Sequence, residues 1–77
     1  MKNLDKIREC ISEVLEVPID LVLLESSNHN FIEWDSFGQV AIATHIENQF
    51  GITFTVEEIF QLSSVKEIYS LVNKKLE

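Results

Sequence analysis

Cysteine, proline and glycine are scarce in this 77-residue sequence, and long hydrophobic runs are missing altogether. The single cysteine, Cys10, excludes an intramolecular disulfide and a cysteine zinc cluster. Such a low cysteine content is typical of proteins in reducing compartments. No apolar stretch is long enough to cross a bilayer, so stable membrane insertion is not expected. The N-terminal residues mix both signs of charge and lead into no hydrophobic segment, so no secretory signal is expected. These shortages together predict a cytoplasmic protein.

Basic residues are also few. The chain has 6 lysines and arginines against 13 aspartates and glutamates, which gives a formal net charge of −7. Such a chain repels phosphate backbones and has no basic run to offset the repulsion, so a nucleic-acid partner is not expected. A chain of this length buries only about 60% of its unfolded surface, which leaves little room for a deep catalytic cleft. We expect residues 1–77 to form one domain that is not an enzyme.

The sequence does contain strong helical periodicity near its start. Between Leu4 and Leu15 the apolar residues recur on one arc and the charges fall opposite, which predicts an amphipathic helix. Asn3 is expected to cap this helix, and Pro18 to end it. Cys10 lies on the apolar arc and is expected to be buried and unreactive. The arc comprises Leu4, Ile7, Cys10, Ile11, Val14 and Leu15.

Residues 18–34 show no sustained helical or strand periodicity in their apolar residues. A connection of this length is expected to contain a short helical turn, to serve function, or both. Its apolar residues are expected to lie against the core, and they are Ile19, Leu21, Leu23, Leu24, Phe31, Ile32 and Trp34.

A second long helix is predicted to begin at Asp35 or Ser36 and to end at Phe50, with Gly51 as a left-handed cap. Ser36 and Gln39 have the spacing of a capping box. The expected inward stripe consists of Ile42, Ala43, Ile46 and Phe50, flanked by Val40.

Two more helices complete the chain. Thr55 and Glu58 have capping-box spacing and introduce a short helix that runs through Phe60. Ser64 and Glu67 introduce the last helix in the same way. The fold class is therefore all-α, with three long helices, one short helix and a long loop between the first two. The inward arc of the last helix is expected to contain Val65, Ile68, Tyr69, Leu71, Val72 and Leu76.

The second helix has an uncharged face opposite its inward stripe. Phe37, Ala41, Thr44 and Asn48 share this face, next to the serine at the helix start. An exposed aromatic beside a hydroxyl suggests a docking surface. The alternative is that Phe37 folds down over the preceding loop as part of the core.

Three roles are possible for Ser36. It can be a plain N-cap, which residue chemistry alone favours. A hydrolase nucleophile would need a base within reach, but His29 belongs to the loop and His45 lies well along the helix. The third role is attachment of a phosphate-linked group, because a helix N-terminus favours an anion. His29 and His45 have no third candidate ligand at suitable spacing, so no metal site is expected.

The sequence from Leu23 to the last helix resembles the acyl carrier protein family, which includes peptidyl and aminoacyl carriers. Members have four helices and an Asp-Ser-Leu motif at the start of the second, which stands here as Asp35-Ser36-Phe37. The similarity continues through the second helix, Phe50-Gly51-Ile52, Val56-Glu57-Glu58-Ile59 and Ser63-Ser64-Val65. The resemblance implies a four-helix acyl-carrier-like bundle.

The resemblance also implies a function. A phosphopantetheinyl transferase would transfer 4'-phosphopantetheine from coenzyme A to Ser36, and Asp35 would help that transferase recognise the site. The arm would carry an acyl or aminoacyl group as a thioester, received from a loading ligase and passed to downstream transferases or synthases. The partner surface would comprise Phe37, Ala41, Thr44, Glu47 and Asn48.

Departures from the family pattern bear on the pathway. Carriers of fatty-acid synthesis usually line the second helix with carboxylates, whereas Glu47 is the one acid of this helix after Asp35. A specialised biosynthetic pathway is therefore expected, because charge complementarity governs partner choice. Asp35-Ser36-Phe37-Gly38 also resembles D-alanyl carriers, which stays a minor option. Trp34 is expected to pack in the loop or to brace the arm. The competing class is a helical interaction module in which Ser36 is only a helix cap.

Overall fold

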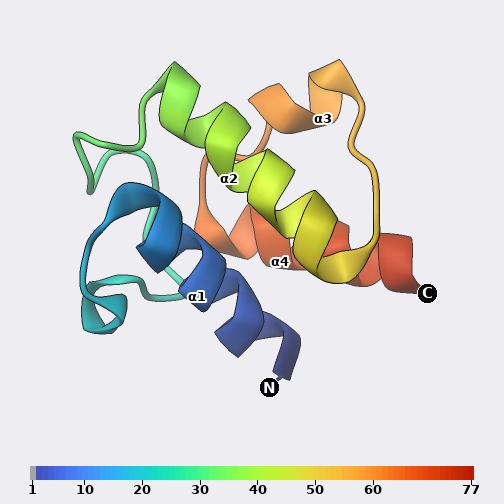
Figure 1. The fold of residues 1–77 in the computed structure, drawn as a ribbon, viewed down its shortest axis with the longest axis horizontal. Coiled ribbons are helices and arrows are strands. Elements are labelled where there is room, and N and C mark those ends of the chain that lie inside the picture. The colour runs from blue at the N-terminus through green and yellow to red at the C-terminus, as the bar shows by residue number, and fades with distance from the viewer. Residues whose placement is uncertain (1) are drawn as a thin grey trace.

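The computed structural model describes residues 2–77 and is helical, as the sequence predicts (Figure 1). Three of its α-helices are long and one is short, and a long connection separates the first two, so the predicted arrangement is confirmed. Within residues 2–77 there is no β-strand beyond one isolated bridge between Ser27 and Ser64. The elements are α1 (Lys2–Leu15), the 3-10 turn η1 (Ile19–Leu21), α2 (Ser36–Phe50), α3 (Val56–Phe60) and α4 (Val65–Leu76).

Helix α1 is the hub of the packing, since it contacts α2, α4 and η1, while α3 packs on α2. Figure 1 shows α1 and α2 side by side, with the long connection looping around one end of the pair. Removal of apolar side chains from water among these elements is the main force that holds them together. The buried core consists of Ile7, Cys10, Ile11, Leu15, Val22, Trp34, Ile42, Ala43, Ile46, Phe54, Leu62, Val65, Ile68 and Val72.

Helix α1 buries the predicted arc but starts earlier than predicted. Asn3 lies inside the helix, so the prediction that it is the N-cap is wrong. Its side-chain amide instead donates a 3.0 Å hydrogen bond to Asn73 Oδ1 on α4. The role of the Asn3 side chain therefore depends on Asn73, which is far away in the sequence. Helical periodicity cannot predict such a distant partner. Leu4 and Val14 on the arc are only partly buried.

The end of α1 contains one backbone feature that favours glycine. Glu16 follows the last helical residue with a φ of 56°. The turn is closed on both sides of it, because Val17 N donates to the Ser12 carbonyl at 3.2 Å and Ser12 Oγ donates to the Val17 carbonyl at 2.6 Å. Pro18 follows and prevents further helix.

The connection between α1 and α2 contains the expected helical turn, η1, and is held mostly by polar contacts. The Arg8 guanidinium donates to the carbonyls of Ile19 and Val22, which ties the connection to α1. Val22 and Trp34 supply its buried apolar side chains, and Phe31 packs partly against them. The prediction that all its apolar residues face the core is wrong for the exposed side chains of Leu21, Leu23, Leu24 and Ile32.

The later helices begin and end as predicted. Gly51 ends α2 with a φ of 67°, and Thr55 and Glu58 form a complete capping box at α3. Ser64 caps α4 by accepting from Glu67 N at 3.1 Å. The turn before α4 is joined to the long connection, since Val65 N donates to the Ser26 carbonyl at 3.0 Å. On the α4 arc, Leu76 is exposed, so its predicted burial is wrong.

Replacing Glu16 with glycine should stabilise the protein. Its Cβ makes the left-handed conformation unfavourable, and relief of this strain is expected to add about 0.5–1 kcal/mol to the free energy of unfolding. Urea unfolding of Glu16→Gly and of Glu16→Ala would test this. The alanine variant removes the charge and keeps the Cβ, so it should stay near wild type. Equal stabilisation by both variants would assign the effect to charge.

Glu58 should make stability fall in acid. The backbone hydrogen bond from Thr55, followed by the Lys75 ammonium at 3.0 Å, lowers the pKa of Glu58 from its ordinary 4.5. Because the folded pKa is below the unfolded one, this contribution is present above about pH 4.5 and is lost as the pH falls through the folded pKa. Glu58→Gln should therefore differ most from wild type at neutral pH and converge with it in acid.

The control for this measurement is Glu57→Gln, whose carboxylate has no hydrogen bond or ion pair with any residue in 2–77. Unfolding of both variants and wild type would be followed by urea titration between pH 3 and pH 7. A Glu58→Gln curve that runs parallel to wild type across this range would contradict the assignment.

Candidate functional site

The start of α2 is capped by Asp35. Its Oδ1 accepts a 2.8 Å hydrogen bond from Gly38 N, and its backbone is extended, as an N-cap requires. Ser36 is consequently the first residue of the helix. The interpretation of Ser36 as the cap is wrong, because the carboxylate one residue earlier holds that position.

The Ser36 hydroxyl is left free by this arrangement. The side chain is exposed, and its Oγ makes no hydrogen bond with any residue that the structure describes. It lies in the first turn, where backbone N–H groups and the helix dipole favour a negatively charged group. An exposed, unengaged hydroxyl at this position is well suited to carry a phosphodiester.

The backbone before Ser36 is pressed against the helix at Gly38. A Cβ added to Gly38 would lie 2.3 Å from the Glu33 carbonyl oxygen, far closer than two such atoms can approach. Trp34, which is 2% exposed, anchors the same segment and stacks on Phe31 with ring centroids 6.5 Å apart. Trp34 therefore packs in the loop, the first of its two expected roles. The role of Gly38 was missed by the sequence analysis.

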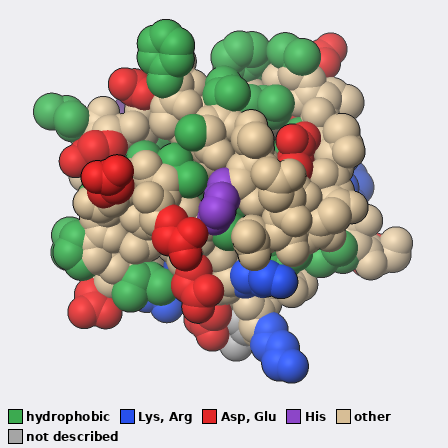
Figure 2. Space-filling view, in the orientation of Figure 1, with side chains coloured by type: hydrophobic (Ala, Val, Ile, Leu, Met, Phe, Trp, Pro, Cys, Tyr) green, Lys and Arg blue, Asp and Glu red, His purple; other side chains and the backbone are tan. Residues whose placement is uncertain are grey.

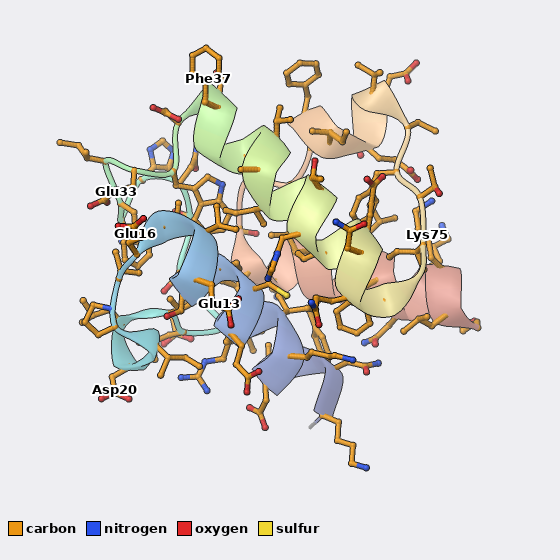
Figure 3. All side chains as sticks on the ribbon, viewed as in Figure 1. Glu13, Glu16, Asp20, Glu33, Phe37 and Lys75 are labelled. Atoms are coloured by element: carbon orange, nitrogen blue, oxygen red, sulfur yellow. The ribbon has the colours of Figure 1, made fainter. Side chains whose placement is uncertain are left out.

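The outer face of α2 is exposed as predicted. Phe37 is 88% exposed and projects away from the body of the protein (Figure 3), so the alternative that it folds over the loop is wrong. Ala41, Thr44 and Asn48 are exposed as well. Inward, Ile42, Ala43 and Ile46 are buried and Phe50 is half-buried.

Two polar side chains of α2 are engaged elsewhere. Glu47 is half-buried, and its Oε2 accepts a 2.7 Å hydrogen bond from Phe54 N, which withdraws this carboxylate from the outer face. Gln39 does not form the predicted capping box, because its amide donates to the Ile59 carbonyl at 2.8 Å and joins α2 to α3. In both cases the segment after α2 supplies the partner.

Neither histidine is hydrogen-bonded to Ser36 in the part of the chain that the structure describes. His45 Nε2 is 3.0 Å from Glu13 Oε2 and links α2 to α1, while His29 is exposed in the long connection. Within residues 2–77, no group of three or more histidine, cysteine, aspartate or glutamate side chains is placed to hold a metal ion.

Comparison with known proteins decides the family. Residues 5–72 match the family model described as a phosphopantetheine attachment site. An acyl carrier protein of Petrotoga mobilis is 31% identical over 94% of this chain and 85% of its own length. Acyl carrier protein 3 of Ralstonia nicotianae is 27% identical over 95% and 84%, and an acyl carrier protein of Thermosynechococcus vestitus is 26% identical over 95% and 90%. The chain belongs to the acyl carrier protein family.

Family membership decides the general role. An acyl carrier protein has 4'-phosphopantetheine covalently attached, is a carrier and not an enzyme, and interacts with a phosphopantetheinyl transferase and with biosynthetic enzymes. The site geometry fits such a group, because the start of α2 offers an exposed hydroxyl that has no hydrogen-bond partner within residues 2–77. None of the helices in residues 2–77 has the length and apolar character needed to cross a membrane.

The carrier's own thiol is kept apart from this chemistry. Cys10 is 2% exposed, as predicted, and burial, followed by the charge of Glu13, raises the pKa of its thiol to about 11. It therefore stays protonated at neutral pH, and the thiol is neither accessible nor nucleophilic.

Gly38→Ala should destabilise the carrier although alanine is the better helix former. Helix propensity alone predicts a gain of about 1 kcal/mol. The Cβ would displace the Glu33 carbonyl, and such overpacking costs about 1–3 kcal/mol, so the net change is expected to be a loss. Urea unfolding measures the difference. Ser36→Ala on the same turn is the control and should change stability by less than about 0.5 kcal/mol, because Ser36 does not cap. A stabilised Gly38→Ala variant would contradict the contact.

Proposed function

We propose that Ser36 is the attachment residue of this acyl carrier protein. Its free, exposed hydroxyl in the first turn of α2 is the observation that carries the proposal. The transferase would form a P–O bond to Ser36 Oγ while the pyrophosphate bond of coenzyme A breaks, adenosine 3',5'-bisphosphate departs with the bonding electron pair, and the hydroxyl proton passes to solvent or to the transferase. The negative charge of the resulting phosphodiester would lie where the helix dipole favours it.

Asp35 has two roles in this proposal. Its Oδ1 caps α2 and so holds Ser36 at the first helical position. The side chain remains exposed, so the transferase can recognise the carboxylate directly beside the hydroxyl that it modifies. One residue thus sets the geometry of the attachment site and marks it.

The proposed partner surface is the outer face of α2, made of Phe37, Ala41, Thr44 and Asn48, with the half-buried Glu47 beside it. The attached group supplies a flexible arm whose thiol holds an acyl or aminoacyl cargo as a thioester. The withdrawal of Glu47 leaves this face without a freely presented carboxylate after Asp35. Such a face supports service in a specialised biosynthetic pathway, with a loading ligase and downstream transferases or synthases as partners in the cytoplasm.

Incubation with coenzyme A and a phosphopantetheinyl transferase should add one 4'-phosphopantetheine to the wild-type chain. Intact mass would measure the addition, and peptide fragmentation would locate it on Ser36. Ser36→Ala should gain nothing while keeping the helical circular dichroism spectrum of wild type, because the serine is not the cap of α2 and its hydroxyl has no hydrogen bond with the residues that the structure describes.

Ser70→Ala is the matched control, since Ser70 is an exposed serine on a different helix, α4. It should be modified as wild type is. Modification of Ser36→Ala, or its loss in Ser70→Ala, would contradict the assignment of Ser36.

A further inference from the structure

The few basic side chains of this acidic protein come from the two ends of the sequence. All lysines and arginines lie in residues 2–8 and 66–75, whereas residues 9–65 contain most of the carboxylates and no basic residue. In Figure 2 the visible lysine and arginine side chains lie around α1 and at one edge of the molecule, and none lies where α2 begins and α3 lies. A negatively charged partner is therefore attracted only to α1 or α4.

Three of the basic side chains are already engaged within the fold. The Arg8 guanidinium donates to two carbonyls of the long connection, and the Lys6 ammonium lies 5.2 Å from the centroid of the Phe50 ring. On α4, Lys75 is paired with Glu58 at 3.0 Å. These three residues have roles inside the molecule.

Lys66 and Lys74 on α4 have no such partners. Both residues are exposed, and neither forms an ion pair with any residue in 2–77. Their spacing places them along one side of α4 and about 12 Å apart along the helix axis. The helix dipole does not account for Lys66, because this residue lies in the first turn of α4, where the dipole disfavours a cation.

The two lysines stand at the ends of a groove, which we call the α4 groove. Its volume is about 350 Å³, and it is lined by residues 61–62 of the turn after α3 and by one side of α4 from Lys66 to Lys74. Leu62 is buried and Leu71 is half-buried, so these two leucines form an apolar floor between the lysines. The groove is therefore apolar along its length and basic at both ends.

The one carboxylate of the α4 groove is held by its neighbours. Glu67 Oε1 accepts hydrogen bonds from the Ser63 and Ser64 hydroxyls at 2.8 Å and 3.1 Å, which keeps this side chain at the start of α4. The exposed Ser70 lies between the two lysines and adds no charge. Two free ammonium groups thus face a single, engaged carboxylate.

The geometry and charge of the groove decide which occupant fits. A small anion cannot bridge two ammonium groups that are about 12 Å apart along the helix. Nucleic acid and anionic lipid surfaces are repelled by the net charge of −7. A helix with apolar side chains on one face and carboxylates about two turns apart at its edges complements both the leucine floor and the two lysines.

We propose that the α4 groove binds an acidic amphipathic helix of a partner protein, with Lys66 and Lys74 pairing to its carboxylates and its apolar side chains lying over Leu71. This inference goes beyond the proposed function, because it does not depend on Ser36. Every lining residue belongs to α4 or to the turn before it, so a bound helix leaves the start of α2 open. A partner can therefore hold the carrier through α4 while other enzymes reach Ser36.

The test measures binding of a fluorescein-labelled, 18-residue peptide to the full chain by fluorescence anisotropy. The peptide consists of leucine, alanine and glutamate, with leucines on one helical face and glutamates at its edges. A control peptide has glutamine in place of every glutamate. The acidic peptide should bind about 10-fold more tightly than the control in 50 mM NaCl, and 500 mM NaCl should remove most of this difference, because salt screens exposed charges.

Variants of the chain locate the binding site. Lys66→Gln and Lys74→Gln should each weaken binding of the acidic peptide about three- to fivefold, as loss of one exposed ion pair predicts. Ser70→Glu should weaken it about 10-fold or more, because the new carboxylate lies between the two lysines. Gln49→Glu, on the exposed surface of α2, is the matched control. It makes the net charge more negative by the same one unit and should bind as wild type does.

Two further measurements separate the groove from the attachment site. Amide NMR signals of residues 61–74 should shift when the acidic peptide is added, and circular dichroism should show that each variant keeps the wild-type helical spectrum. Saturating peptide should leave the rate of phosphopantetheine attachment within about twofold. A chain that gains no phosphopantetheine even without peptide contradicts the proposed function of Ser36 and leaves the groove proposal intact.

Several outcomes would overturn the groove proposal. Equal affinity for the acidic and control peptides, or an unchanged affinity in Lys66→Gln and Lys74→Gln, would remove the role of the lysines. Cosedimentation of the chain with phosphatidylglycerol vesicles that both variants abolish would assign the groove to a membrane surface. A dimer in sedimentation equilibrium that Ser70→Glu dissociates would assign it to a second copy of the chain.

Discussion

The contact between the Glu33 carbonyl and the backbone of Gly38 determines where the functional helix begins. With no Cβ at Gly38, the last residues of the long connection lie against the first turn of α2, and a Cβ there would lie 2.3 Å from the carbonyl oxygen. In that position Asp35 reaches Gly38 N and takes the cap. Ser36 then enters the helix with its hydroxyl unused. The chemistry of the site therefore depends on a close approach of two backbone segments.

That approach is supported from further back in the chain. Trp34 is buried next to Phe31, and its indole fixes the segment from within the core. Arg8 holds the carbonyls of η1 and Val22 against α1, and Ser26 and Ser63 bond the connection to the turn before α4. A long connection with few buried side chains is ordered here because its polar backbone groups have partners on α1, in the turn before α4 and within the connection itself. The two ends of this connection thus receive different support, apolar at Trp34 and polar at Arg8.

Periodicity and capping chemistry predicted the helices well, because both act between residues close in sequence. Gly51, Thr55 and Ser64 have the roles expected from their neighbours. Predictions failed where a distant partner competed for a side chain, as at Asn3, which bonds to Asn73, and at Gln39, which bonds to Ile59. The free Ser36 hydroxyl was missed for a local reason, since Asp35 and Ser36 are both good caps and one register shift separates them.

The exposed apolar residues of the long connection show that hydrophobicity alone does not predict burial. Hydrophobicity alone placed Leu21, Leu23, Leu24 and Ile32 against the core, but without a helical or strand period it does not say which way a side chain faces. The exposure of Val56 and Phe60 was likewise not predicted, because α3 is too short to show a hydrophobic period.

The thiol of Cys10 and the thiol of the phosphopantetheine arm are in different environments. A thioester on the arm is at risk from any nucleophilic thiolate nearby, and the protein's own cysteine is the nearest candidate. Burial on α1 and the charge of Glu13 hold the pKa of Cys10 near 11, so at neutral pH the thiolate form is rare and solvent-inaccessible. Ser36, the proposed attachment residue, has the opposite surroundings, because its side chain is exposed at a helix start and its hydroxyl has no hydrogen-bond partner among residues 2–77. Thiol reactivity is thereby confined to the end of the arm, and the folded chain provides the surface that partner enzymes bind.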